Sequence, residues 1–116
     1  MASISSEVVT QLWHSLVGGE MSAALPLLHP DVFCSNQPWE PMTGAQAVCD
    51  YLQPLIDGTC LSLKEMSILH QVAEGGVVMN AREETWSCEA MELVLSVAGL
   101  FVVERRLVTR WIDYWD

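Results

Sequence analysis

Two carboxylates and one arginine occupy positions in this sequence where their side chains could act together. Arg82 and Glu84 are two residues apart in a segment with β-strand character, so both side chains point to the same face. In the last predicted strand, Asp113 shares a face with Trp111 and Trp115. Two carboxyl groups in a pocket of low dielectric constant cannot both ionise freely, and an arginine stabilises the charge that remains. Such a group of residues could perform general acid and base catalysis.

A simpler interpretation is that Arg82 and Glu84 form a solvated ion pair on an exposed face of a sheet. The apolar runs 77–79 and 101–103 argue against it, because runs without alternation are typical of strands buried on both faces. A charge among such strands must be paired. A purely structural network of ion pairs remains an alternative.

The elements that would position these residues follow a simple order, with helices first and strands afterwards. The expected helices run from Ser5 or Ser6 to Gly18, from Met21 to Leu28 and from Ala45 to Ile56, with a short strand Val32–Asn36 and a loop Gln37–Gly44 before the third. Four long antiparallel strands are predicted at Leu61–Ala73, Gly76–Trp86, Met91–Val103 and Leu107–Trp115. This order predicts an α+β fold. A curved, mostly antiparallel sheet wrapped around the N-terminal helices would form a cone whose inward side chains line a pocket.

Length and composition favour one domain over residues 1–116, with a large apolar interior. The hydrophobic fraction of 51% and mean hydropathy of +0.27 are high for a short soluble chain. They indicate an apolar cavity, a buried subunit interface or both, so we expect a homodimer.

The net charge of −10 excludes some classes of partner. With five basic residues, the chain offers no basic stripe for a nucleic-acid backbone, and its negative field favours a small neutral lipophilic substrate over an anion. No apolar run reaches the roughly 20 residues that span a bilayer, so no membrane association is expected.

The cysteines indicate a cytoplasmic protein with reduced thiols. Cys34, Cys49, Cys60 and Cys88 form no CxxC pair, and the sequence has no signal-peptide pattern. No ligand spacing joins them to His14, His29 or His70, so neither a metal nor another cofactor is expected.

Three stretches resemble the limonene-1,2-epoxide hydrolase family of the SnoaL-like and NTF2-like superfamily. They are Asn36 with the proline-rich stretch that ends at Gly44, the run Asn80 to Glu84, and the run Arg110 to Asp116. The resemblance covers nearly the whole chain and implies a cystatin/NTF2-like cone. It also implies a cofactor-independent hydrolase that opens a small lipophilic epoxide to a vicinal diol in one concerted acid/base step.

The resemblance assigns a role to each polar residue. Asp113 corresponds to the base that deprotonates a water, Asn36 helps to hold that water, Glu84 is the acid and Arg82 lies between the carboxylates. Opening an epoxide requires a nucleophile at carbon and a proton for the departing oxygen, and a carboxylate with a carboxylic acid supplies both. No covalent enzyme intermediate is then needed.

Two positions depart from the family pattern. Glu84 replaces an aspartate and is one methylene longer, which changes the position of the carboxyl group. Cys34 stands where the family has a tyrosine that gives the water a third hydrogen bond, and a thiol is a weak donor and acceptor.

The weak water ligand at Cys34 keeps other functions open. In a cyclase or isomerase with the same fold, Asp113 would deprotonate a substrate hydroxyl or an acidic carbon instead of water. A third possibility is a domain that only binds a hydrophobic ligand or a partner. In each case we expect an apolar pocket, with walls drawn from Trp111, Cys34, Phe101, Met79, Leu93 and Leu95.

Overall fold

The chain forms three helices, one 3-10 turn and a six-stranded sheet over the residues described by the computed structural model, which are 3–37, 39–58 and 61–115. The helical elements are α1 (Ile4–Val17), α2 (Met21–Ala24), the 3-10 turn η1 (Leu25–Leu27) and α3 (Ala45–Ile56). The strands are β1 (Leu28–Gln37), β2 (Met42–Thr43), β3 (Ser62–Glu74), β4 (Val77–Cys88), β5 (Met91–Glu104) and β6 (Leu107–Trp115). The predicted α+β order is confirmed.

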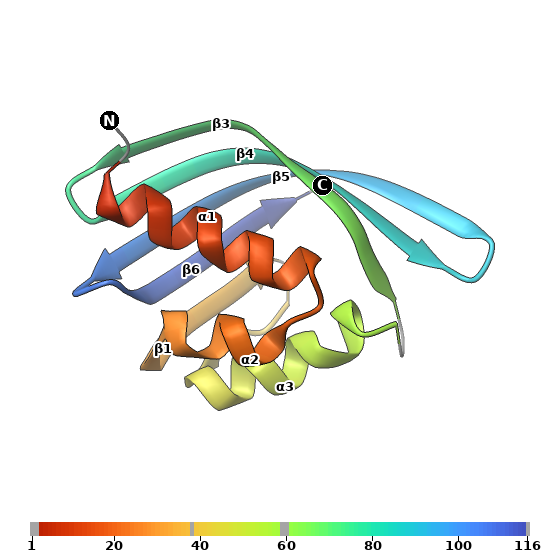
Figure 1. The fold of residues 1–116 in the computed structure, drawn as a ribbon, viewed down its shortest axis with the longest axis horizontal. Coiled ribbons are helices and arrows are strands. Elements are labelled where there is room, and N and C mark those ends of the chain that lie inside the picture. Colours follow the sequence, from red (N-terminus) through yellow and green to blue (C-terminus); the bar gives the residue numbers. More distant parts are fainter. Residues whose placement is uncertain (1–2, 38, 59–60, 116) are drawn as a thin grey trace.

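The sheet is mostly antiparallel and strongly curved. Its strands lie in the order β2-β1-β6-β5-β4-β3, and β1 pairs with β6 in the parallel direction. The long strands β3 to β6 form an antiparallel meander that arches over α1, while α3 lies beside β1 (Figure 1). This arrangement confirms the predicted curved sheet wrapped around N-terminal helices.

Helix α1 is anchored to the edge of the sheet at its N-terminus. It is capped by Ser3, whose side-chain oxygen accepts a hydrogen bond from the Ser6 amide, so the predicted cap at Ser5 or Ser6 is wrong. Ser5 instead donates its hydroxyl to the carbonyl of Gly75, in the turn between β3 and β4. The buried face of the helix consists of Val8, Val9, Leu12, Trp13 and Leu16.

The predicted helix Met21–Leu28 is shorter than expected. It divides at Leu25 into α2 and η1, and β1 starts at Leu28 rather than Val32. Pro26 lacks the N–H that a continuing α-helix needs. The predicted loop Gln37–Gly44 contains the short strand β2, and its position 38 lies outside the described residues.

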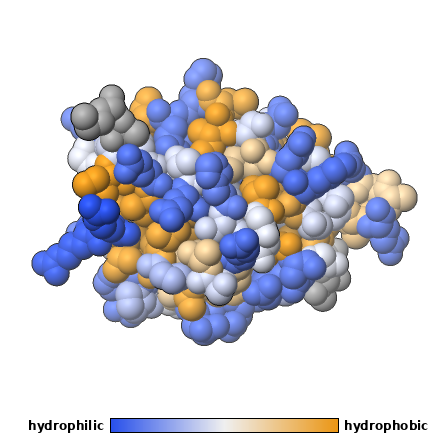
Figure 2. All heavy atoms as spheres, in the orientation of Figure 1, coloured by the Kyte–Doolittle hydropathy of each residue, from blue (hydrophilic) through white to orange (hydrophobic). Residues whose placement is uncertain are grey.

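The two faces of β4 differ in exposure. The residues on its concave side are buried, namely Val78, Asn80, Arg82 and Glu84. Val77 and Met79 point outward and are exposed, so the predicted burial of this strand on both faces is wrong. None of the described helices packs on the convex face to cover them. On the face seen in Figure 2, hydrophobic side chains also reach the surface in patches among hydrophilic ones.

The described residues show three further properties relevant to function. No described helix is long and apolar enough to cross a lipid bilayer. Cys34, Cys49 and Cys88 are free thiols, and Cys60 lies outside the described residues. Among the residues described, no three histidine, cysteine, aspartate or glutamate side chains are arranged to hold a metal ion.

Candidate active site

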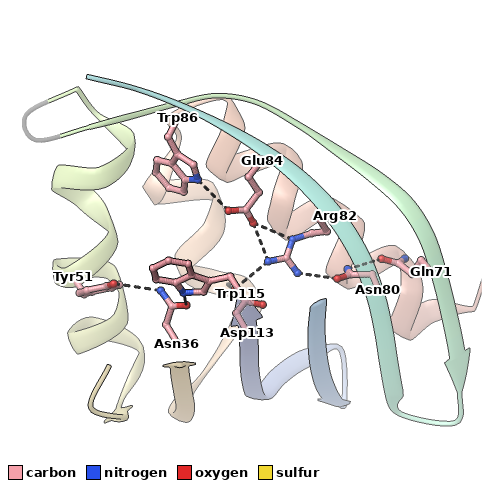
Figure 3. A network of polar contacts seen from close by, with 9 residues as sticks. All are labelled: Asn36, Tyr51, Gln71, Asn80, Arg82, Glu84, Trp86, Asp113 and Trp115. Atoms are coloured by element: carbon pink, nitrogen blue, oxygen red, sulfur yellow. Dashed lines mark hydrogen bonds and ion pairs between the residues drawn. The ribbon is translucent and has the colours of Figure 1, made fainter. Parts of the chain in front are cut away.

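A buried arginine joins two carboxylates inside the cone (Figure 3). Arg82 Nη2 lies 2.9 Å from Glu84 Oε2 and 3.0 Å from Asp113 Oδ2. Arg82 Nε donates a further hydrogen bond of 3.1 Å to Glu84 Oε2. The arginine side chain is fully shielded from solvent and both carboxylates are nearly so. The three residues on the predicted inward faces of β4 and β6 therefore meet at one point.

Gly99 makes this meeting sterically possible. It lies on β5 between the two other strands, paired with Asn80 on one side and with Asp113 on the other. A Cβ atom at this position would overlap Arg82 Nη1 and would lie 2.9 Å from both Asn80 Oδ1 and Asp113 Oδ1. The guanidinium thus occupies the space that a side chain at residue 99 would fill.

Aromatic rings cover the remaining sides of the guanidinium. Its carbon lies 4.1 Å from the ring centroid of Trp13, on α1, and 5.9 Å from that of Phe101, on β5. Trp111 contacts both rings, edge-on to Trp13 and tilted against Phe101. A cation over the face of an aromatic ring is stabilised by the ring's negative potential, so this shell favours a buried arginine that stays charged.

Asp113 is held in a state that is easily protonated. Burial raises its pKa to about 6 from an ordinary 3.8, and the positive charge of Arg82 opposes that rise without cancelling it. The negative charge of Glu84 adds to the rise. Asp113 Oδ1 and the indole Nε1 of Trp111 are both buried, and the interaction with Trp111 also lowers the pKa of Asp113. A carboxyl group with a pKa near neutrality is well suited to accept and release a proton.

Glu84 has more hydrogen-bond donors around it than Asp113. Its Oε2 accepts two bonds from Arg82, and its Oε1 accepts a 3.1 Å bond from the indole Nε1 of Trp86. Each carboxylate oxygen has two lone pairs, so the Trp86 bond leaves a second position on Oε1 where a proton can reside. Trp86 therefore orients the carboxyl group without blocking it.

Asn36 lies beside Asp113, on the neighbouring strand β1, and is fixed by two partners. Cα pairing in the parallel β1–β6 ladder places Asn36 opposite Asp113. The indole Nε1 of Trp115 donates to Asn36 Oδ1 at 2.8 Å, and Asn36 Nδ2 donates to the Tyr51 hydroxyl at 3.4 Å. The second hydrogen on Nδ2 remains for another acceptor, and so does the phenol hydrogen of Tyr51.

Cys34 is two residues before Asn36 on the same strand and pairs with Trp111 on β6. Its thiol is buried, and burial together with the charge of Asp113 raises its pKa to about 12. Cys34 is therefore a neutral thiol at physiological pH and does not serve as a thiolate nucleophile.

A cavity of about 440 Å³ opens onto this group of residues. Its lining is mostly apolar but includes Glu84, Asp113, Asn36 and Tyr51. All five tryptophans of the chain contribute to it, namely Trp13, Trp39, Trp86, Trp111 and Trp115. Aromatic and aliphatic walls around a few convergent polar groups are typical of small-molecule sites.

The predicted cavity walls are only partly correct. Trp111, Cys34, Leu93 and Leu95 line the cavity. Phe101 is fully buried and packs against Trp111, but it is not among the lining residues. Met79 is 52% exposed on the convex face, because it is an odd number of residues from Arg82 on the same strand.

Sequence reasoning missed several residues that contact the site. Trp86 shares the strand face of Glu84, so alternation alone could have found it. Trp13 and Tyr51 come from helices, and the sequence carries no signal that these two side chains reach the cavity. Gly99 could be recognised only from its pairing with Asn80 and Asp113.

Comparison with protein families gives one match over nearly the whole chain. The model of the limonene-1,2-epoxide hydrolase catalytic domain matches residues 5–116. Comparison with curated proteins gives no significant match.

Solved structures with low sequence identity share the fold. An LEH-like epoxide hydrolase from M. tuberculosis is 19% identical, with a TM-score of 0.89 over 97% of this chain and 83% of its own. A protein with a ketosteroid isomerase-like fold from Catenulispora acidiphila DSM 44928 is 16% identical, with a TM-score of 0.84 over 95% of this chain and 85% of its own. A putative SnoaL-like polyketide cyclase from Jannaschia sp. CCS1 is 13% identical, with a TM-score of 0.82 over 97% and 85%. These likenesses confirm the predicted NTF2-like fold.

Proposed function

Because the chain belongs to the limonene-1,2-epoxide hydrolase family, we propose that it adds water to a small lipophilic epoxide and yields a vicinal diol. The observation that carries the proposal is the bridge that Arg82 forms between Glu84 and Asp113 at the wall of an apolar cavity. Arg82 holds the two carboxyl groups close together, so both could act on one substrate molecule in the cavity. The fold alone would not support this reaction over others, since one fold hosts many chemistries.

Asp113 is the proposed base. With a pKa of about 6, it is ionised at neutral pH and retains enough proton affinity to take a proton from water. As that proton leaves, the water oxygen forms a bond to an epoxide carbon, and the bond between that carbon and the epoxide oxygen breaks. The reaction needs ionised Asp113 together with protonated Glu84, so the pair must hold one proton, and the rate should fall on both sides of the pH range in which it does.

Glu84 is the proposed acid. Its proton passes to the epoxide oxygen as the ring opens, so the second hydroxyl of the diol forms in the same step. The negative charge then moves from Asp113 to Glu84, and Arg82 contacts both carboxylates throughout. A fixed cation in a water-poor cavity stabilises both arrangements without reorganising. Return of the proton from Asp113 to Glu84 completes the cycle.

Asn36 and Tyr51 are the proposed ligands of the attacking water. Asn36 lies opposite Asp113, and its free amide hydrogen can donate to the water oxygen. The hydroxyl of Tyr51 is adjacent to that amide and comes from α3 rather than from β1. Tyr51 would thus compensate for the weak hydrogen bonding of Cys34.

Turnover of a panel of alicyclic and aliphatic epoxides tests the proposal. We expect diol formation by the unmodified protein and a loss of about 10²- to 10⁴-fold in Asp113→Asn. Asp31→Asn, which changes an exposed aspartate on β1, is the matched control and should turn over the epoxides normally.

A single turnover in water labelled with oxygen-18 should place the label in the diol. Label that enters only in later turnovers would indicate attack by a protein carboxylate and contradict direct attack by water.

The second candidate function is a cyclisation or isomerisation in the same cavity. The buried neutral thiol at Cys34 favours it, because a weakly held water is a poorer nucleophile than a substrate group positioned by binding. The panel separates the two functions. A folded protein that turns over no epoxide would shift the assignment to a cyclase or isomerase with a dedicated substrate, or to a binding domain.

A further inference from the structure

A chain of hydrogen bonds leads from Arg82 away from the cavity to helix α1. Figure 3 shows its first part, from Arg82 through Asn80 to Gln71. Arg82 Nη1 donates to Asn80 Oδ1 at 2.7 Å, and Asn80 Nδ2 donates to Gln71 Oε1 at 3.1 Å. Gln71 Nε2 then donates to the backbone carbonyl of Ser6 at 3.3 Å and to Thr10 Oγ1 at 3.2 Å. The chain thus joins β4, β3 and α1 in sequence.

The partner at the outer end determines the orientation of both amides. A backbone carbonyl can only accept a hydrogen bond, so Ser6 requires Gln71 to present its nitrogen to α1 and its oxygen to Asn80. Asn80 must then donate to Gln71 and present its own oxygen to Arg82. If Asn80 turned over, its amino group would face Arg82 Nη1, and if Gln71 turned over, its amino group would face that of Asn80, so in each case a donor would face a donor.

We propose that Asn80 and Gln71 are positioning residues that hold the Arg82 guanidinium against Asp113 and Glu84 through this fixed chain. Neither residue lines the cavity, so neither is a catalytic group. The other hydrogen-bond partners of Arg82 cannot take over the role of Asn80 and Gln71, because they contact other nitrogens of the guanidinium. Glu84 holds the Nε and Nη2 side of the guanidinium, whereas Asn80 is the hydrogen-bond acceptor that holds Nη1.

The arrangement has a consequence for Asp113. The positive charge of Arg82 lowers the pKa of this carboxyl group, in opposition to burial. A guanidinium that moves away weakens that effect, so the titration midpoint of Asp113 should rise. The groups that face Asp113 are Arg82 and Glu84 on β4, Gly99 on β5, Trp111 on β6 and Cys34 on β1. The thiol of Cys34 stays neutral, with a pKa of about 12.

Two substitutions test the inference at different distances from the site. Gln71→Leu removes the middle of the chain without touching Arg82, and Asn80→Leu removes the acceptor itself. Thr109→Val is the matched control, because it removes a half-buried hydrogen bond, from the Thr109 hydroxyl to the Val102 carbonyl, that is not part of the chain. Carbon-13 NMR of aspartate-labelled protein follows the Asp113 carboxyl against pH, with its signal assigned by its absence in Asp113→Asn.

We expect the Asp113 midpoint to rise by about half a pH unit or more in Gln71→Leu and in Asn80→Leu, and to stay unchanged in Thr109→Val. The double variant should shift no further than Asn80→Leu alone, because both residues act through one chain. An unchanged midpoint in both single variants, with folded protein shown by the rest of the spectrum, would overturn the inference.

Kinetics give a second readout that rests on the proposed function. For an epoxide that is turned over, kcat should fall about tenfold in Gln71→Leu with KM little changed, since the cavity walls are intact. The acid limb of the pH profile should move upward with the Asp113 midpoint. If no epoxide is turned over but the midpoint moves, the proposed function fails while the positioning role stands.

Discussion

The two faces of strand β4 depart at several positions from the usual pattern of a half-exposed sheet, in which apolar side chains face the core and polar ones face water. Its concave face buries Asn80, Arg82 and Glu84, while its convex face exposes Val77 and Met79. The buried polar residues are joined to one another and to Asp113. The concave face therefore carries a connected polar network, whereas the convex face carries exposed apolar side chains.

The arrangement of the buried polar residues follows from the cost of burying charge. A buried ion is tolerated only when partners satisfy it, and the guanidinium has acceptors on Asn80, Glu84 and Asp113. A low dielectric constant then strengthens every charge interaction at the site. Among the residues that the structure describes, the convex face carries no such buried charged network, so substitutions there should leave the chemistry unchanged.

The largest effect should come from Gly99→Ala. The added methyl group overlaps Arg82 Nη1 and crowds Asp113, so the bridge between the carboxylates must shift. We expect kcat/KM to fall by about 100-fold or more, because displacement of a positioned group by an ångström has effects of that size. Ala98→Val, the matched control, adds bulk on the exposed face of the same strand and should change kcat/KM less than about twofold. A fully active Gly99→Ala protein would contradict the proposed geometry.

A smaller effect is expected for Tyr51→Phe. Loss of one hydrogen bond to the attacking water corresponds to about 1 kcal/mol, or roughly a five- to tenfold fall in kcat. Tyr114→Phe removes a hydroxyl from an exposed tyrosine on β6 and is the matched control. Equal activity of Tyr51→Phe and the unmodified protein, measured on the same epoxide, would exclude Tyr51 as a ligand of the water.

The raised pKa of buried Asp113 also predicts how the free energy of unfolding depends on pH. Asp113 has a higher pKa in the folded chain, about 6, than its ordinary value of 3.8, so the folded state binds its proton more tightly. This contribution to stability is fully present below about pH 4 and is lost as the pH rises through about 6. Asp113→Asn lacks this loss, so it should gain about 2 to 3 kcal/mol relative to the unmodified protein between pH 4 and 7. Urea unfolding of both proteins across this range, with Asp31→Asn as control, measures the difference; parallel curves would contradict the raised pKa.

The smallest effect on chemistry is expected on the convex face. Cross-strand pairing aligns Val72, Met79, Leu100 and Ile112 in an apolar row across four strands. This row is where a second copy would bind if the chain forms the homodimer that its composition predicts. Light scattering should then give a dimer mass for the unmodified protein and a monomer mass for Met79→Glu. Met91→Glu, which changes an exposed methionine in β5, should remain dimeric, and a monomeric unmodified protein would contradict the prediction.

Much of the fold and part of the site could be predicted from local patterns. The long strands and α3 lie within two residues of their predicted limits, because strand alternation and helix-stop residues are local signals. The same alternation places Arg82 with Glu84 and separates them from Met79, which it should have excluded from the cavity. The predicted burial of Val77 and Met79 failed because an apolar strand face is also compatible with an uncovered sheet.

The sequence by itself determined which side chains share a face and that three charged residues needed partners. Only the tertiary structure decided that Gly99 lies beneath Arg82, that Trp13 and Tyr51 reach the cavity from helices, and that Asn80 connects the site to α1 through Gln71. The physical reason is one of range. Side-chain direction follows from the dihedral angles of neighbouring residues, whereas strand register, helix docking and the burial that raises the pKa of Asp113 depend on contacts between residues far apart in the chain.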